Sequence, residues 1–228
     1  MPPPEISIII ATNRNHADYS KVVVDNINSL GNRRSYEICV VSQEPTEGEN
    51  VRWIEEKTRL GPIAAFNYAV DKSEGNYVVI CVDDHVPVNR IDNAINFLES
   101  NFFDDRKYKI TSLNPGAPCY NPVRGDILGD SPIDFDVGRY PLLRFPIFDK
   151  QTLKLLGGKI FHPAHYYHSS DIFLSYWLGK NGEPGVDGPC YIRGHRPTKD
   201  STYEVADCNI SRELIRMLEL NPKMEYLA

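Results

Sequence analysis

The chain has 228 residues, of which 41% are hydrophobic and 25% charged, and this composition is typical of one globular unit with a sizeable core. Its formal net charge is -6 and no block of Lys or Arg interrupts the sequence, which disfavours a nucleic-acid binder. The apolar runs are too short to cross a bilayer as helices, and no basic and apolar leader is visible, so we expect no transmembrane segment and no signal peptide.

The cysteines indicate a reducing compartment. They are dispersed, odd in number and never arranged as C-x-x-C: Cys39, Cys81, Cys119, Cys190 and Cys208. Two of them, Cys39 and Cys81, lie inside apolar runs, where a reduced cysteine behaves as a small hydrophobic residue. We therefore expect a cytoplasmic protein.

Apolar runs of strand length alternate with helical patterns through the first half of the chain. Strands are predicted over 6–10, 37–42, 51–54, 77–82 and 109–113. Helices are predicted over 17–30, 61–72 and 89–100. This alternation predicts parallel βαβ units with helices on both faces of the sheet. Ligands of such sheets bind beyond the carboxyl ends of the strands.

The second half has a different character. Residues 114–144 are rich in Pro, Gly, Asp and aromatic residues without a regular period, which predicts short strands and a mobile loop. Helices are predicted over 170–180 and 211–220. The sequence contains no internal repeat, so we predict a single domain over 1–228 with two functional halves.

Acidic residues follow the most apolar predicted strand. Asp83, Asp84 and His85 come directly after the run 77–82. On an extended backbone Asp83 and His85 would point to the same side and Asp84 to the other. Carboxylate and imidazole together suit a metal such as manganese. Alternatively, the two acids cap a turn before Pro87, and this tripeptide alone leaves both interpretations open.

Five segments carry a family resemblance. In chain order they read SIIIATNR, EICVVS, RLGPIAAFNYAV, GNYVVICVDDH and SSDIFLSYWLGKNG, and together they reach from Ser7 to Gly182. They resemble the landmarks of family-2-type GT-A glycosyltransferases. The resemblance implies an α/β GT-A fold, with a mostly parallel central sheet flanked by helices. It also implies transfer of one sugar from a nucleotide-diphosphate sugar to a carbohydrate or other hydroxyl acceptor, with 1–113 binding nucleotide and metal and 114–228 shaping the acceptor site.

The metal motif of this family is usually D-x-D, whereas this chain has the D-x-H variant of the polypeptide N-acetylgalactosaminyltransferases. Those enzymes complete the metal shell with a histidine in a P-C-x-x-x-G-H segment, which residues 189–195 match. The resemblance therefore implies Asp83, His85 and His195 as ligands of Mn²⁺ or Mg²⁺. Without the motif, His195 would be interpreted as a solvated loop histidine.

Three further histidines form a competing set: His162, His165 and His168. On a helix they would share one face and bind zinc, but Pro163 and the surrounding aromatic residues argue against a regular helix. We expect them to line the acceptor pocket or to pack beneath it, and we rank them as second-choice metal ligands.

The resemblance also places the nucleotide. It implies donor contacts from Thr12, Asn13, Arg14, Ser42, Gln43, Gly61, Asn67, Asp83 and Asp84. The second strand of the family usually ends in an Asp that reads uracil, and here Ser42 and Gln43 stand at this point. A UDP-sugar is thus the default donor, with GDP- and dTDP-sugars left open. Arg14 and Arg59 are interpreted either as diphosphate contacts or as surface ion pairs.

The catalytic base is expected on the helix over 170–180. The family uses an acid from an E-D pair there, and in this chain Asp171 takes the place of the second acid while Ser170 replaces the first. The helix dipole favours an ionised Asp in the first turn, which equally explains a purely structural Asp171. As a base, Asp171 implies inversion of configuration. The polypeptide transferases retain configuration and carry Asn at this place, so the stereochemistry stays open.

Other classes fit less well. A sugar-nucleotide pyrophosphorylase needs a Gly-rich basic loop after the first strand, and a dinucleotide oxidoreductase needs G-x-G-x-x-G, and the sequence has neither. The Q-x-x-R-W element of processive synthases is also absent, which favours transfer of a single sugar. The non-enzyme alternative is a degenerate domain that binds a nucleotide or a partner without turnover. Ser170, His85 and the missing uracil Asp favour it, whereas Asp83, His195 and Asp171 oppose it.

Overall fold

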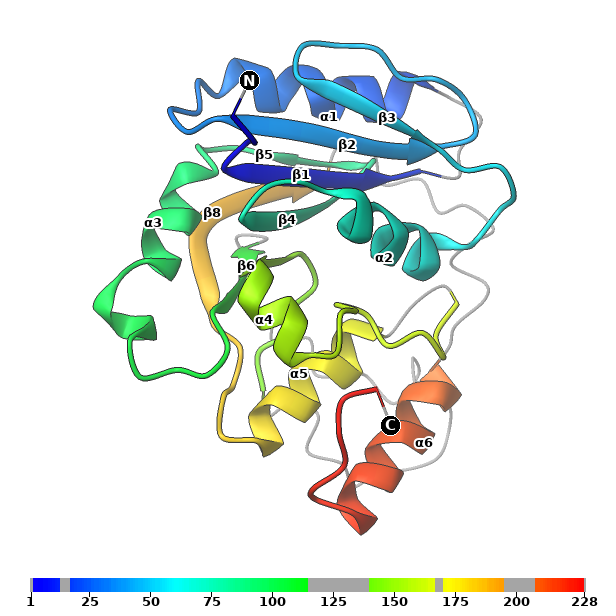
Figure 1. Ribbon diagram of the computed structural model, residues 1–228, viewed down its shortest axis with the longest axis vertical. Coiled ribbons are helices and arrows are strands. Elements are labelled where there is room, and N and C mark those ends of the chain that lie inside the picture. The colour runs from blue at the N-terminus through cyan, green and yellow to red at the C-terminus, as the bar shows by residue number, and fades with distance from the viewer. Residues whose placement is uncertain (1, 13–16, 115–139, 167–169, 195–207, 228) are drawn as a thin grey trace.

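A computed structural model describes residues 2–12, 17–114, 140–166, 170–194 and 208–227. These residues form a mixed α/β fold with helices on both sides of one sheet (Figure 1). The sheet has eight strands in the order β3-β2-β1-β4-β7-β6-β8-β5. The predicted alternation of strands and helices in the first half is thereby confirmed.

The elements have the following bounds. The strands are β1 (Ile6–Ala11), β2 (Tyr36–Ser42), β3 (Val51–Glu55), β4 (Tyr77–Val82), β5 (His85–Pro87), β6 (Ile110–Asn114), β7 (Pro146–Asp149) and β8 (Asp187–Gly194). The helices are α1 (Ala17–Ser29), α2 (Pro62–Lys72), α3 (Asp92–Leu98), the 3-10 helix η1 (Asn101–Phe103), α4 (Lys150–Leu155), α5 (Ser170–Lys180) and α6 (Cys208–Leu220).

The first four strands, β1 to β4, run parallel and end at one edge. β1 pairs in parallel with β2 and β4, so that Ala11 lies opposite both Val41 and Val82, and β3 extends this arrangement beyond β2. The second half adds β7, antiparallel to both β4 and β6, and β8, parallel to β6. The residues after β1, β2 and β4 therefore meet at the same carboxyl edge, where parallel sheets bind ligands.

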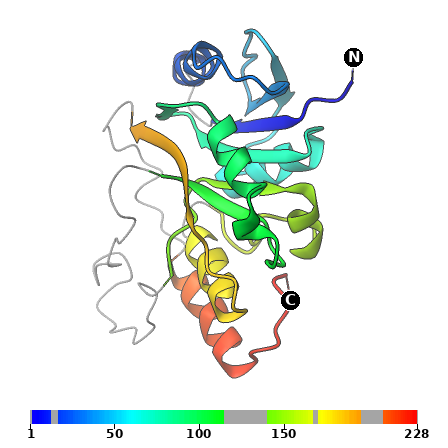
Figure 2. The same cartoon turned by 90° about the vertical axis from the view of Figure 1, so that its left-hand side faces the viewer.

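Alternate side chains of the central strands enter two separate cores. Ile9 and Ile80 belong to the core that contains α2, α4, α5 and α6. Ile8, Ile10 and Val79 point the other way, into the core that contains α1 and α3. Because both faces are covered, the strands are apolar throughout rather than alternating. Figures 1 and 2 show α1 at one end of the molecule and the packed pair α5 and α6 at the other.

The sheet curls strongly. β5 follows β4 after only Asp83 and Asp84, yet it pairs with β8, at the other end of the strand order. In this ladder His85 lies opposite Gly194 and Pro87 opposite Ile192. Strand β8 of the second half thus lies next to the residues that follow β4.

The third helix begins later than its periodicity predicts, at Asp92 instead of residue 89. The Asn89 side chain bonds strand β8, donating to Pro189 O at 2.8 Å and accepting from Tyr191 N at 2.6 Å. Asn89 is thereby held outside the helix. Within the described part of the chain, we find no helix whose length and apolar character would let it span a membrane.

Candidate functional site

Polar side chains gather where β1 and β4 end. Thr12, which follows β1, donates from Oγ1 to Asp83 Oδ2 at 2.6 Å, and both side chains are buried. The backbone of Thr12 is held as well, because its N–H donates to Val41 O at 3.0 Å. The structure thus brings two of the residues predicted to bind the nucleotide sugar into direct contact. Asn13 and Arg14, which follow them in the prediction, lie outside the described residues.

Asp83 and Asp84 form a turn, and the assumption of an extended backbone at this point is wrong. The chain must reverse there because β5 leaves the parallel sheet to pair with β8. In consequence Asp84 does not point away from His85. Its Oδ1 lies 2.7 Å from His85 Nδ1, while both carboxylates remain buried, with 7% and 6% of their surface exposed.

His85 extends from this turn into solvent. Its side chain is 30% exposed, and its ring lies against Phe145 with 5.2 Å between the ring centroids. Its Nε2 lies toward Gly194, since a Cβ placed on that glycine would be 3.6 Å from this nitrogen. The contact with Asp84 through Nδ1 leaves Nε2 as the nitrogen that faces β8.

The donor atoms at this turn are of the type that a divalent metal requires. Carboxylate oxygen and imidazole nitrogen both suit Mn²⁺, and a carboxylate on the second ring nitrogen is the usual support of a metal-bound histidine. Among the residues that the structure describes, no group of three acidic, histidine or cysteine side chains is arranged to hold a metal ion. His195, the third predicted ligand, lies outside that part of the chain.

The end of β2 is held from β3. Trp53 Nε1 donates to Ser42 Oγ at 3.2 Å, and Ser42 Oγ donates to Glu44 O at 2.6 Å. Gln43 is exposed, and its Oε1 accepts from Arg59 Nε at 3.5 Å. Arg59 is exposed beside Gln43, and both of its predicted roles, a diphosphate contact and a surface ion pair, remain predictions. Ser42 is buried, and its hydroxyl already bonds Trp53 and Glu44 within the fold.

Helix α2 begins close to a segment of the second half. Gly61 precedes the helix with φ of +80°, and Pro62 occupies the first turn, as its missing N–H allows. A Cβ on Gly61 would lie 2.9 Å from Tyr166 O and from the Tyr166 ring, and Ile63 N donates to the same carbonyl at 3.4 Å. The sequence pattern singled out Gly61 but gave no indication of this contact.

Asn67 joins the two halves at the middle of α2. Its Nδ2 donates to Phe161 O at 2.8 Å and its Oδ1 accepts from Phe161 N at 3.2 Å. The side chain is 5% exposed. The structure therefore places both the nitrogen and the oxygen of the Asn67 side-chain amide against the backbone of residue 161. Its predicted contact with the nucleotide remains a prediction.

Asp171 lies in the first turn of α5, as the sequence predicts. Its backbone oxygen accepts from Ser175 Oγ at 2.7 Å, and Ser175 Oγ in turn accepts from Leu143 N at 2.9 Å. Ser170, which replaces the first acid of the family motif, is buried and accepts from His162 N at 2.9 Å. The segment 161–166 thus runs from the start of α5 to α2.

Two of the competing histidines, His162 and His165, belong to this segment and are buried. His162 and His165 are 6% and 3% exposed, and neither lies in a helix. His165 Nε2 lies 2.8 Å from Ser211 Oγ on α6, and burial lowers the pKa of His162. Their burial fits one of the two roles expected from the sequence, packing beneath the acceptor pocket, and the other role, lining that pocket, remains a prediction. His168 lies outside the described residues.

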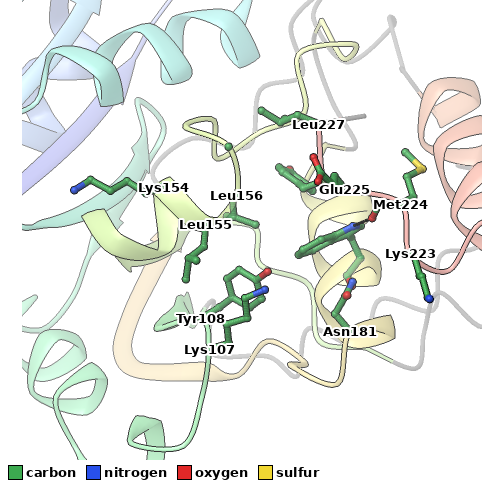
Figure 3. Close-up of a pocket in the computed structure, with 13 residues that line it drawn as sticks. Lys107, Tyr108, Lys154, Leu155, Leu156, Asn181, Lys223, Met224, Glu225 and Leu227 are labelled. Carbon is green, nitrogen blue, oxygen red and sulfur yellow. Dashed lines mark hydrogen bonds between the residues drawn. The ribbon is translucent and has the colours of Figure 1, made fainter.

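A separate cavity of about 430 Å³ opens at the far end of α5 from Asp171. Figure 3 shows Tyr108, Asn181, Met224, Glu225 and Leu227 around it. Trp177, which lies two turns after Asp171 on α5, forms part of its wall. The acidic turn does not line this cavity, so we do not assign the donor site to it.

Solved structures that superpose on this chain include glycosyltransferases. The mannosyltransferase PcManGT from Pyrobaculum calidifontis, in complex with GDP-Man and Mn²⁺, superposes with a TM-score of 0.56 at 19% identity, over 83% of this chain and 56% of that one. S. aureus TarS 1-349 in complex with UDP-GlcNAc superposes with a TM-score of 0.61 at 15% identity, over 97% of this chain and 68% of that one. A further structure of S. aureus TarS gives 0.59 at 14% identity, over 97% and 41%.

These similarities establish the fold. The chain has a mixed α/β architecture, with a mostly parallel curled sheet flanked by helices. It is the GT-A fold, which confirms the fold class expected from the sequence. The chain spans little more than half of the mannosyltransferase, at 56% of its length. No protein-family model and no curated protein sequence matches this chain.

Proposed function

We propose that this chain is a metal-dependent glycosyltransferase, which moves one sugar from a nucleotide-diphosphate sugar to an acceptor hydroxyl. The observation that carries the proposal is the buried Asp83–Asp84 turn, held by Thr12 at the carboxyl edge of the parallel strands. The same fold occurs in solved structures that contain GDP-Man with Mn²⁺ and UDP-GlcNAc. UDP-sugar remains the default donor, because the neutral Ser42 and Gln43 do not identify the base.

Asp83, His85 and His195 are proposed to hold Mn²⁺ or Mg²⁺. The carboxylates of the adjacent residues Asp83 and Asp84 lie at the carboxyl edge of the sheet, next to the His85 imidazole, and this set of oxygen and nitrogen donors suits Mn²⁺. The strand register supports the third ligand, because His195 directly follows Gly194, which pairs with His85. When bound, the metal would stabilise the diphosphate leaving group as a Lewis acid.

Asp171 is proposed as the base that accepts the proton of the acceptor hydroxyl. Its place in the first turn of α5 favours the ionised form that a base requires. The segment 161–166 connects this helix to the nucleotide-binding half, because His162 N donates to Ser170 and Tyr166 contacts Gly61. A single displacement with Asp171 as base gives inversion at the anomeric carbon.

Calorimetric titration of UDP, GDP, dTDP and CDP, each with and without Mn²⁺, tests the donor site. We expect metal-dependent binding of one nucleotide, lost in Asp83→Ala and in His195→Ala. Asp25→Ala is a matched control, because this exposed carboxylate pairs only with Lys21 on α1 among the contacts that the structure describes. Binding that is unaffected by metal and by both site variants would refute the proposed metal site.

Donor-dependent turnover tests the enzyme itself. In Asp171→Asn we expect turnover to fall by about 100-fold or more while donor affinity is kept, since general-base catalysis contributes about that much. A wild-type rate in this variant would remove Asp171 as the base. Nucleotide binding without any turnover would instead support the alternative function, a degenerate domain that binds without catalysis, which the Ser170 replacement favours.

A further inference from the structure

Met224 and Tyr226 contact α5, the helix that carries Asp171, at two positions along its length. Trp177 Nε1 donates to Met224 O at 3.1 Å. One turn earlier, the ring of Tyr226 stacks on Phe173 with 5.5 Å between centroids and 11° between planes. Both aromatic contacts are buried, so the segment 224–226 packs along the helix as part of the core.

The hydroxyl of Tyr226 contacts the segment 160–162, which lies against the start of the same helix. It is buried, and it donates to Ile160 O at 2.9 Å. Burial is the main cause that raises the pKa of Tyr226, and the negative charge of Asp171 adds to the rise. Hydrogen bonds from the His162 backbone and the Ser170 side chain oppose it. The Tyr226 ring also lies edge-on to the His162 ring, with 6.0 Å between centroids, and His162 N donates to Ser170 Oγ at the start of α5.

We propose that Tyr226 is a positioning residue for Asp171. Its ring holds the first half of α5 through Phe173, and its hydroxyl fixes the segment 160–162 against Ser170. The inference rests on the proposed function, in which Asp171 is the base, and it extends that function to a residue 55 positions further along the chain, at 226 against 171. None of these contacts reaches the acidic turn, so donor binding is expected to be independent of Tyr226.

Loss of the hydroxyl has a defined local consequence. In Tyr226→Phe the ring stack on Phe173 is kept, while Ile160 O loses its buried donor. The segment 160–162 then loses its bond to Tyr226 and holds Ser170 less firmly through His162 N. The first turn of α5 gains freedom to shift. A displacement of about 1 Å at a reacting group costs up to about 100-fold in rate.

The experiment compares Tyr226→Phe with Tyr108→Phe in the full chain. Tyr108 is a matched control, because it is also 2% exposed and also packs edge-on against Trp177, at 5.7 Å. Two readouts are needed: hydrogen exchange of the Leu174 and Ser175 amides, which bond to the first-turn carbonyls, and the split between kcat and the donor KM.

In Tyr226→Phe we expect faster exchange of these amides and a fall of about 10-fold in kcat, with the donor KM close to that of Tyr108→Phe. Unchanged exchange, unchanged kcat, or an equal effect in Tyr108→Phe would overturn the proposal. A rise in donor KM that accounts for the lost activity would also overturn it. If the wild-type chain shows no donor-dependent turnover, the proposed function fails, and the exchange still decides whether Tyr226 holds the first turn.

Discussion

Substituting Gly61 with alanine tests the contact between the two halves at the start of α2. The glycine has φ of +80° and ψ of +155°, a region that other residues essentially do not occupy. Its added Cβ would lie 2.9 Å from Tyr166 O and from the ring of the same residue. The carbonyl oxygen of Tyr166 accepts from Ile63 N at 3.4 Å, so it cannot move away from the added Cβ without losing that bond.

The cost has two parts. The backbone conformation alone costs about 1–3 kcal/mol for a residue with a Cβ, and forcing an atom into a packed contact costs a similar amount. We expect Gly61→Ala to lower the free energy of unfolding by about 3 kcal/mol, which for a chain of this length lowers Tm by about 6–12 °C. Urea denaturation and thermal unfolding measure the two quantities.

Gly182→Ala is the matched control. Gly182 has φ of +79°, but a Cβ placed there meets no atom within 4 Å. This variant carries only the backbone cost, about 1–2 kcal/mol. The reasoning is refuted if Gly61→Ala destabilises the protein no more than Gly182→Ala does, since the contact with Tyr166 would then have no energetic weight.

Two further predictions concern buried polar groups. Asn67→Leu leaves the buried N–H and C=O of Phe161 without their partners and should cost about 2–4 kcal/mol in urea denaturation, and a loss under about 1 kcal/mol would contradict this. Burial lowers the folded-state pKa of His162, so the unfolded chain binds the extra proton and stability falls as pH drops below about 6.5. The Tm of His162→Phe relative to wild type should therefore be higher at pH about 5.5 than at about 7.5, and equal differences would count against this.

Local patterns account for most of the first half of the fold. The apolar runs identify β1, β2 and β4 because strands covered on both faces are apolar throughout. Gly61 and Pro62 mark the start of α2 for reasons of backbone geometry that the sequence displays directly. The strands β5, β7 and β8 were not located, because strands that pair with partners distant in the sequence carry little local signal. The late start of α3 likewise depends on a bond from Asn89 to β8.

The candidate site divides in the same way. The position of Thr12 and Asp83 at one sheet edge follows from the parallel arrangement, which the sequence predicts. The bonds between Asn67 and Phe161 join residues 94 positions apart, and no motif marks position 161 as their partner. The Asp83–Asp84 turn depends on where β5 finds its own partner, so its geometry was also beyond local reasoning.

The curl of the sheet makes the acidic turn part of a closed circuit. From β4 the hydrogen bonds run through β7, β6 and β8 to β5, and the chain returns from β5 to β4 through Asp83 and Asp84. Both ends of this link are anchored, so it cannot relax unless one of the strand pairs in the circuit opens. A fragment that ends at residue 113 would contain the whole acidic motif and still lack β7 and β8, the strands that hold it in place.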